Sequence, residues 1–403
     1  MTKITDIPAI RFKGFSDTWE QRKLGEVAKY RNGKAHENCI DESGKYIVVN
    51  SKFVSTNGTV IKHSNMQNEP LAQNEIAFVL SDVPNGRAIA RTFLVEENDK
   101  YTLNQRIAGI TSSENTYPYF LHILMNRHPY FLAFDDGVKQ TNLSVSDVLN
   151  FETYYPEYEE QKQIGEYFRN LDRLITLHQR KYDKLTNVKK SMLEKMFPQN
   201  GSNVPEIRFK GFTEAWEQRK AIDIADYSKG NGYSKGDLTD AGTPIILYGR
   251  LYTKYQFAIS EVDTFAVPRN GAVYSQGNEV IVPASGETAE DIARASAVEK
   301  SGVLLGGDLN ILRPFDFINP LFLALAISNG EPQKELAKKA QGKSVVHIHN
   351  TDIQEVTIAY PSRTEQDRIV SVFRQLDNLI TLHQRELEKL KKLKKACLEK
   401  MFV

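Results

Sequence analysis

Two groups of polar side chains in this sequence have the chemistry to contact nucleic acid. Arg, Asn and Gln can form paired hydrogen bonds with base edges, and Lys can neutralise phosphates. In the first half of the chain such residues gather in segments that carry Gly and Asn: Ser81, Asn85, Arg87, Arg91, Gln105, Arg106, Lys139, Gln140 and Asn142. The second half contains Tyr248, Arg250, Tyr252, Lys254, Ser275, Gln276, Lys343, His347 and His349. Any one of them is equally compatible with an ordinary solvated position, so each group as a whole predicts an interface.

Residues for catalysis or metal binding cannot be assigned from their spacing. The sequence before Gly342 lacks the glycine that a phosphate-binding loop needs five residues earlier. His347, His349 and Asp352 come near to a metal-binding His-x-His-x-Asp pattern. The aspartate stands one residue too late, however, which favours a hydrogen-bonding loop. We therefore predict no catalytic residue and no metal in this chain.

Two long helices must position these groups. Residues 160–197 and 365–402 are matched copies without a gap, and neither contains Gly or Pro after Gly165. Apolar residues recur at heptad spacing along two seams, the pattern of a coiled coil, and two matched copies favour mutual pairing over packing on a globular body. The residues predicted to pair the helices are Leu171, Ile175, His178, Leu185, Leu376, Ile380, His383 and Leu390. Each helix would be roughly 50 Å long and would act as a spacer.

The rest of the chain is also written twice. PAIRFKGFSDTWEQRK from Pro8 returns as PEIRFKGFTEAWEQRK from Pro205, with the only two tryptophans, Trp19 and Trp216, at the same place. PQNGSN after Phe197 marks the linker between the copies. The two bodies between phrase and helix differ, but the runs KYIVVN, EIAFVL, EVIVPA and VTIAYP predict strands in both. A duplicated scaffold with two diverged bodies suggests recognition of two different targets at a fixed distance.

We predict an α+β protein with two α/β bodies separated by two long helices, arranged as an internal pseudo-twofold repeat. Residues 1–156 would form an N-terminal segment and the first body, and residues 157–198 the central helix. Residues 199–361 would form the linker, a second N-terminal segment and the second body, and residues 362–403 the C-terminal helix.

Composition narrows the class of protein. A chain of 403 residues is long enough for two or three domains, and its 52 basic residues are balanced by 51 acidic ones. This balance argues against a stand-alone electrostatic binder of nucleic acid, although local basic faces remain compatible with it. Cys39 and Cys397 form no disulfide framework or metal pattern, and no run resembles a signal peptide or a membrane span. We expect a cytoplasmic protein.

The arrangement of these segments resembles the specificity subunit of type I restriction-modification enzymes. The phrases that carry the resemblance are YYPEYEEQKQI at Tyr154 and AYPSRTEQDRI at Ala359, with the long helices that follow them. WEQRKL at Trp19, IILYGRLYTKY at Ile245 and ASGETAEDIA at Ala284 also match. The resemblance covers essentially the whole chain in the order of the family's segments.

The resemblance implies a DNA-reading role. Each body would be a target recognition domain for one half of a bipartite, asymmetric DNA site. The helices would pair antiparallel and set a non-specific gap, since such a rod can hold two readers about one DNA turn, ~34 Å, apart. Two docked methyltransferase subunits would methylate adenine N6, and restriction subunits would cleave the DNA. S-adenosylmethionine, ATP and Mg²⁺ would bind in those partners, so that this chain would hold no cofactor.

Two other classes of function remain open at this stage. A self-sufficient nuclease or methyltransferase would need a nucleotide or metal site, for which the sequence offers no pattern. A coiled-coil adaptor that joins two protein-binding bodies would show no dependence on DNA sequence.

Overall fold

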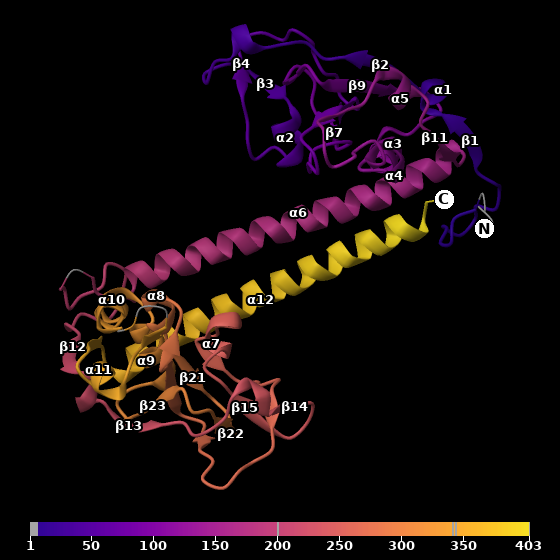
Figure 1. Ribbon diagram of the computed structural model, residues 1–403. Helices are drawn as coiled ribbons and strands as arrows, with labels where there is room; N and C mark the ends of the chain where they lie inside the picture. Colours follow the sequence, from indigo (N-terminus) through magenta and orange to yellow (C-terminus); the bar gives the residue numbers. More distant parts are fainter. Residues whose placement is uncertain (1–6, 200, 341, 343–344, 403) are drawn as a thin grey trace. The chain divides into compact units, whose positions relative to one another are not determined.

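The computed structural model describes residues 7–199, 201–340, 342 and 345–402 (Figure 1). The chain divides into two compact units, Met1–Gln179 with Arg385–Val403 and Arg180–Gln384, which we call the first and the second unit. One boundary between the units lies within the long helix α6 (Tyr158–Lys195), and the other lies within the long helix α12 (Arg363–Lys400). Each unit therefore contains the start of one long helix and the end of the other. The mixed sheets and helices confirm the predicted α+β class.

In its described part, the first unit is built on two small sheets. A four-stranded antiparallel sheet has the order β2-β9-β5-β7, a mixed three-stranded sheet has the order β4-β3-β8, and two ribbons pair β1 with β11 and β6 with β10. The strands are β1 (Glu20–Lys23), β2 (Ala28–Asn32), β3 (Tyr46–Val49), β4 (His63–Ser64), β5 (Ile76–Val79), β6 (Ser81–Asp82), β7 (Thr92–Leu94), β8 (Tyr101–Leu103), β9 (Ile107–Ser112), β10 (Thr141–Asn142) and β11 (Glu152–Tyr155). The short helices are α1 (Leu24–Val27), η1 (Glu37–Cys39), α2 (Ser51–Ser55), α3 (Pro118–Met125), α4 (Pro129–Leu132) and α5 (Val145–Leu149).

The described residues of the second unit repeat this plan with larger sheets. Their orders are β13-β23-β19-β21-β16 and β14-β17-β15-β22-β18, and the ribbons are β12-β25 and β20-β24. The strands are β12 (Glu217–Lys220), β13 (Ala225–Lys229), β14 (Leu238–Thr239), β15 (Thr243–Ile246), β16 (Ala258–Ile259), β17 (Phe265–Ala266), β18 (Tyr274–Gln276), β19 (Glu279–Pro283), β20 (Ser285–Gly286), β21 (Ser296–Val298), β22 (Ser301–Leu305), β23 (Leu309–Pro314), β24 (Val346–His347) and β25 (Thr357–Tyr360). The short helices are η2 (Ala221–Asp223), η3 (Lys235–Asp237), α7 (Arg250–Thr253), α8 (Ala289–Ile292), α9 (Pro320–Ile327), α10 (Gly330–Lys339) and α11 (Asn350–Gln354).

The central strands are covered on both faces. Every side chain of β5 and of β19 is buried, which suits the continuous apolar runs in these two strands. The four predicted strand runs are confirmed as β3, β5, β19 and β25. Pro118 and Pro320 stand in the first turns of α3 and α9, where a missing N–H costs no intrahelical bond.

Each tryptophan packs the end of a long helix into the core of its unit. In the first unit Trp19 lies edge-on to Phe402, with ring centroids 6.4 Å apart. In the second unit Trp216 lies edge-on to Phe197 at 6.0 Å. Such aromatic pairs add favourable edge-to-face contacts to the burial of large apolar surfaces. Since Phe402 follows α12 and Phe197 follows α6, each body closes around the last turn of the helix that begins in the other unit.

The Glu-Gln pair at the start of each long helix fixes that helix to its body. The carboxylate of Glu160 is fully buried and accepts two hydrogen bonds of 2.6 Å from Arg11. The next residue, Gln161, accepts from the Tyr117 N–H at 3.0 Å and donates to the Pro156 carbonyl at 2.8 Å. The second unit repeats both contacts. The shared Glu-Gln phrase is therefore a structural anchor.

The second copy of this anchor, in the second unit, uses the same hydrogen bonds. Arg208 donates to the buried Glu365 at 2.7 and 2.8 Å. Gln366 accepts from the Asn319 N–H at 2.8 Å and donates to the Pro361 carbonyl at 2.9 Å. A buried charge is tolerated only when it is paired and hydrogen-bonded, which explains why arginine and glutamate appear together in both copies.

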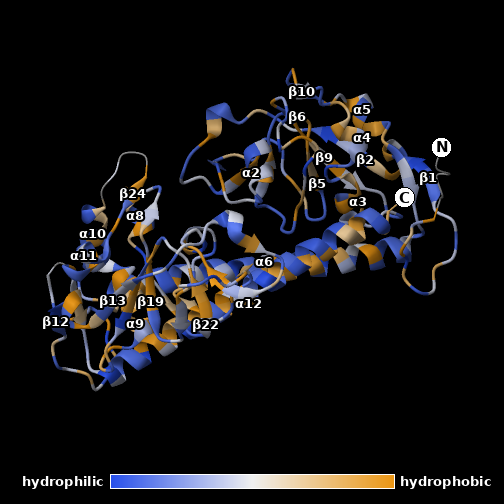
Figure 2. Cartoon of the chain, turned by 60° about the horizontal axis from the view of Figure 1, so that its bottom comes forward, coloured by the Kyte–Doolittle hydropathy of each residue, from blue (hydrophilic) through white to orange (hydrophobic). Residues whose placement is uncertain are grey.

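Burial along α6 and α12 follows the heptad seams. Leu171 is buried, and the other predicted pairing residues are half-buried: Ile175, His178, Leu185, Leu376, Ile380, His383 and Leu390. Most positions between the seams are exposed, and Figure 2 shows hydrophilic and hydrophobic residues interleaved along both helices. None of the helices in the described residues is long and apolar enough to cross a membrane.

Contacts within the first unit show that the two long helices are antiparallel there. The Lys394 ammonium lies 2.6 and 2.8 Å from the two carboxylate oxygens of Asp172. Tyr167, earlier in α6, has its hydroxyl 3.5 Å from the Sγ of Cys397, later in α12. The residue number therefore rises along one helix as it falls along the other.

The second unit repeats this arrangement with the roles of the helices exchanged. Lys189 lies 2.5 Å from Asp377, and the rings of Phe197 and Phe373 are 6.3 Å apart. These helix segments are again antiparallel. The lysines on the otherwise apolar seam, Lys189 here and Lys394 in the first unit, are thus the cations of interhelical ion pairs.

Candidate nucleic-acid interface

A two-stranded ribbon brings predicted polar residues together in each unit. In the first unit β6 pairs with β10 and places Asn142 opposite Ser81. In the second unit β20 pairs with β24 and places His347 opposite Ser285. We call residues 81–87 with 135–142 the first ribbon, and residues 285–286 with 346–349 the second ribbon. The two ribbons occupy equivalent places, because β6 and β20 both follow the central strand of their unit.

Amide side chains are held in place on the first ribbon. Gln140 donates to the hydroxyl of the buried Ser81 at 2.7 Å, and Asn142 donates to the Gln140 carbonyl at 3.4 Å. Asn85 donates to the Gly137 carbonyl at 3.2 Å, which joins the two loops. Since Asn85, Gln140 and Asn142 are exposed, their remaining donors and acceptors are available to a base edge. The buried Ser81 thus fixes the amide of Gln140.

Positively charged side chains belong to the same two loops as these amides or follow them directly. Arg87 and Lys139 are exposed, and no ion pair among the described residues neutralises either one. Arg91 is half-buried, and its Nε donates to the Arg87 carbonyl at 2.6 Å. Burial and the neighbouring charges of Arg127 and Arg87 lower the pKa of Arg91. Arg91 thus supports Arg87 through its backbone.

Sequence reasoning missed the residue that shapes the first loop. Asp82 accepts hydrogen bonds from the N–H groups of Val83 and Ile89 at 2.9 and 3.1 Å and from that of Ala88 at 2.5 Å. A Cβ on Gly86 would lie 2.1 Å from the Asp82 carboxylate carbon, so only glycine fits there. The phrase SDVPNG is a turn signal that could have indicated this role.

Two exposed valines on the first ribbon were also missed. Val83 is 64% exposed and Val138 is 77% exposed, and each belongs to one of the two loops. An apolar side chain among polar readers can contact the methyl group of thymine. A valine inside a Gly/Asn/Pro turn, where no core is available, is the signal that could have identified both.

Gln105 and Arg106 lie beside the first ribbon, in the turn between β8 and β9. The Leu80 N–H donates to the Arg106 carbonyl at 3.0 Å, directly before Ser81. Gln105 donates to Glu37 at 2.6 Å, and Arg106 has a left-handed backbone with φ of 65°. The structure therefore brings this predicted pair next to the residues of the ribbon.

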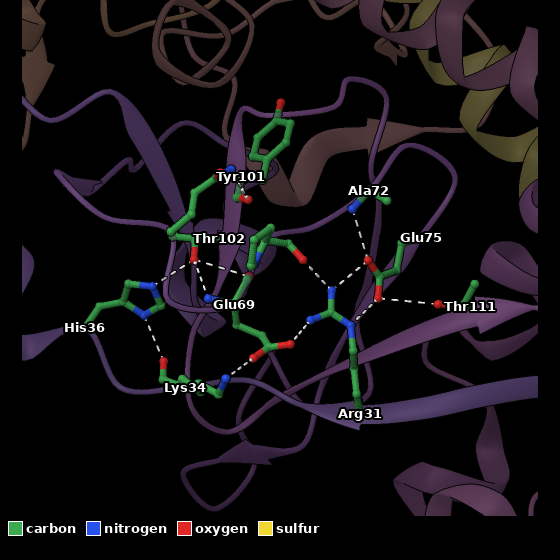
Figure 3. Close-up of polar contacts among 11 residues, drawn as sticks. Arg31, Lys34, His36, Glu69, Ala72, Glu75, Tyr101, Thr102 and Thr111 are labelled. Carbon is green, nitrogen blue, oxygen red and sulfur yellow. Dashed lines mark hydrogen bonds and ion pairs between the residues drawn. The ribbon is translucent and has the colours of Figure 1, made fainter.

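A polar network, drawn in Figure 3, adjoins this turn, because the ring of His36 lies 3.3 Å from the side chain of Asn104. Arg31 bridges two acids: it donates to Glu75 at 2.7 and 2.8 Å and also binds Glu69. Lys34 pairs with Glu69 at 2.8 Å. The hydrogen bond from Lys34 and, to a smaller extent, that from Arg31 lower the pKa of Glu69, against the effect of burial, which raises it. His36, fully inside this network, lies 2.8 Å from the Thr102 hydroxyl in β8.

The second ribbon carries different chemistry at the same place. The His347 Nδ1 lies 3.1 Å from the Ser285 hydroxyl across the strand pair. Tyr252 of α7 donates to the Ser285 carbonyl, and its ring lies 6.0 Å from that of Tyr248. Tyr248, Tyr252 and His347 are thus grouped as predicted from the sequence, although Ser285 was not predicted.

Other residues predicted in the second body have partners inside the protein. Arg250 lies 2.5 Å from Asp263, and Lys254 pairs with the same carboxylate. Hydrogen bonds from Lys254 and then from Arg250 lower the pKa of Asp263. Ser275 is buried and donates to the Lys300 carbonyl at 2.6 Å, and the Gln276 N–H donates to Glu279 at 2.7 Å. The side chains of Arg250, Lys254 and Ser275 therefore have partners away from the second ribbon, whereas Gln276 is bonded through its backbone and its side chain is exposed.

His349 caps the N-terminus of the short helix α11. The Asp352 carboxylate accepts from the His349 N–H at 2.7 Å and lies 3.5 Å from its ring Nδ1, which is a helix cap. This contact confirms the hydrogen-bonding loop predicted from the sequence. Among the described residues no group of three or more His, Cys, Asp and Glu side chains could hold a metal ion. Lys343 lies outside the described residues.

Comparison with known proteins gives the family. Residues 16–187 and 213–392 match the type I restriction modification DNA specificity domain, once in each repeat. Over 394 residues the chain is 21% identical to the type I restriction enzyme MjaVIII specificity subunit of Methanocaldococcus jannaschii, covering 94% of this chain and 91% of that protein. The fold is similar to the crystal structure of a type-I restriction-modification system S subunit from M. genitalium. The TM-score is 0.63, at 16% identity, covering 98% of this chain and 99% of the other.

The duplicated bodies, the two anchored long helices and these matches agree over most of the chain. Sequence recognition on DNA is accordingly the role of this protein. The chain belongs to the family of type I restriction-modification specificity subunits.

Proposed function

We propose that the two ribbons each read one half of a bipartite, asymmetric DNA site. The observation that carries this proposal is their equivalence in place and difference in chemistry. The first ribbon exposes the amides of Gln140 and Asn142, and the second exposes the imidazole of His347. Amides and imidazoles donate to and accept from base edges in different patterns. Two different readers on one duplicated scaffold therefore recognise two different half-sites.

The paired long helices set a non-specific gap between the half-sites. Each helix has 38 residues without an internal break, and ion pairs join the helices in both units. A continuous helix transmits a fixed length because its rise per residue is constant. In this proposal the length of the helices sets the gap, independently of the base sequence between the half-sites.

Two copies of one methyltransferase subunit dock on this scaffold. Leu174 and Leu177 of α6 are 43% and 46% exposed, and the matching Leu379 and Leu382 of α12 are 44% and 52% exposed. Leucines three residues apart lie on one helix face, so each copy of the helix presents the same apolar pair to solvent. A surface that is kept in both repeats, while the bodies diverge, suits two identical partners.

The chemical steps belong to the partner subunits. The methyltransferase subunits bind S-adenosylmethionine and methylate adenine N6, and restriction subunits use ATP and Mg²⁺ to cleave. This chain only determines which DNA sequence the complex recognises. Its charges nearly cancel, so the isolated chain binds DNA weakly and the assembled complex completes a basic channel.

The test is to co-express the chain with its methyltransferase subunit and to map N6-methyladenine across the host DNA. We expect a split motif with a fixed gap that is methylated on both strands. Gln140→Ala should relax the motif in one half only and His347→Ala in the other, each by about 1–3 kcal/mol of base discrimination. Lys23→Ala, an exposed change on β1, serves as the control and should leave the motif unchanged.

A stable complex that leaves the DNA unmethylated would contradict this function and favour an adaptor without DNA specificity. Two variants that relax the same half of the motif would refute the assignment of one half-site to each ribbon.

A further inference from the structure

A basic depression lies next to the first ribbon on the first unit. It has a volume of about 410 Å³ and is lined by Lys52, Lys62 and Arg106 together with small polar groups. These three cations are exposed, and no acidic side chain lines the depression. No ion pair among the described residues neutralises any of the three. Three uncompensated cations in one hollow attract an anion.

The floor of this depression is held rigidly. Asn104 donates its backbone N–H to the Val49 carbonyl at 3.1 Å, and the Asn104 side chain lies 3.3 Å from the ring of the buried His36. Asn50 accepts from the Phe53 N–H at 2.9 Å and so fixes the segment that carries Lys52. The backbone is thus in place before a ligand arrives, which reduces the ordering entropy that binding costs.

The second unit lacks the charge of Arg106 at the equivalent place. The Gly306 N–H donates to the Ile246 carbonyl at 3.0 Å, as Asn104 does to Val49, and the Ala284 N–H donates to the Asp308 carbonyl, as Leu80 does to Arg106. Asn104, Gln105 and Arg106 therefore correspond to Gly306, Gly307 and Asp308. The second unit therefore has a negative charge where the first unit has the positive charge of Arg106.

We propose that Lys52, Lys62 and Arg106 form a binding site for a backbone phosphodiester of the DNA flanking the first half-site. The proposal rests on the function proposed above, because the depression adjoins the ribbon through the Leu80–Arg106 hydrogen bond of 3.0 Å. Lysine contacts to phosphate position a protein on the duplex without reading its sequence. This site would hold the DNA backbone beside the first half-site.

The test measures the salt dependence of DNA binding by the complex of the full chain with its methyltransferase subunits. The probe is a labelled duplex that contains the methylated motif. Each lost phosphate contact should make the slope of log Kobs against log salt concentration less steep by about 0.9, so Lys52→Ala/Lys62→Ala should change it by about 2. Lys23→Ala/Lys29→Ala removes the same charge from exposed sites of the same unit and should change the slope little. The methylated motif should stay the same in both double variants.

A second probe locates the phosphate. In a series of duplexes, single phosphodiesters flanking the first half-site are replaced by neutral methylphosphonates. At one position the replacement should weaken binding by the wild-type complex but not by the Lys52→Ala/Lys62→Ala complex. Equal slopes for the two double variants would overturn the proposal. A changed slope without any such position would assign the two lysines to a general attraction for DNA and would also overturn the proposal. Neither result affects the proposed function, which the motif of the wild-type complex and the Gln140→Ala and His347→Ala variants test separately.

Discussion

Replacing Arg11 by methionine tests the anchor at the start of α6. The change removes both hydrogen bonds to Glu160, whose side chain is 0% exposed, whereas that of Arg11 is 11% exposed. A buried charge left without its partner typically costs about 3–5 kcal/mol. Replacing both partners by apolar residues removes the charge as well, so Arg11→Met/Glu160→Met should lie within about 1–2 kcal/mol of the wild type.

The two tryptophans make the assay specific for one unit. Trp19 is buried beside Phe402 in the first unit, and Trp216 is buried beside Phe197 in the second. In a Trp216→Phe background, fluorescence during urea unfolding reports the first unit alone. Arg11→Met should lower the urea midpoint by about 1 M or more.

An exposed ion pair in the same unit is the matched control. Arg22 and Glu20 are 45% and 68% exposed, so Arg22→Met should cost only about 0–1 kcal/mol. Equal losses for Arg11→Met and Arg22→Met would refute the anchoring argument. Failure of Glu160→Met to restore stability in the Arg11→Met variant would refute the account based on an unpaired buried charge.

Three further changes test other parts of the scaffold. Lys189→Asp places two acids together at Asp377 and should destabilise the second unit by about 1 kcal/mol, and adding Asp377→Lys should restore it; Trp216 fluorescence in a Trp19→Phe background measures both, and no restoration would argue against the ion pair. Burial lowers the pKa of His128 from 6.5 to about 4, and its Nδ1 accepts from the Tyr130 N–H, so stability should fall as the pH drops from about 6.5 towards 4. His128→Asn keeps the cap and removes the proton, so identical pH profiles for both proteins would contradict this assignment. Leu174→Gln/Leu177→Gln should reduce the bound methyltransferase subunits from two to one in native mass spectrometry, while the exposed Arg173→Ala/Thr176→Ala control keeps both; an unchanged complex would exclude this face.

The long helices and their pairing seams could be predicted from the sequence because their information is local. Heptad spacing determines which face of a helix is apolar, and the buried and half-buried positions from Leu171 to Leu390 follow that spacing. The duplication likewise needed only a comparison of the chain with itself. The predicted domain boundaries follow the chain order, whereas the compact units join the last residues of α12 to Trp19 through Phe402.

The composition of the candidate interface depended on tertiary structure. Lys254 and Arg250 have the right side chains for DNA, but Asp263, brought to them by the fold, pairs with both. Ser275 turned out to be buried. Whether a loop cation is free depends on neighbours that are distant in sequence, and no local period encodes them.

The sequence by itself therefore determined the family, the repeat and the paired helices. A coiled-coil seam depends on spacing along one helix, and a duplicated phrase is found by comparing the chain with itself. Only the tertiary structure decided that Ser81 and Asn142 lie on one ribbon, and that Arg106 joins Lys52 and Lys62 in one depression. These groups come from separate segments, and the strand pairing that unites them is set by the burial of β5 and β9 between the other elements of the first unit.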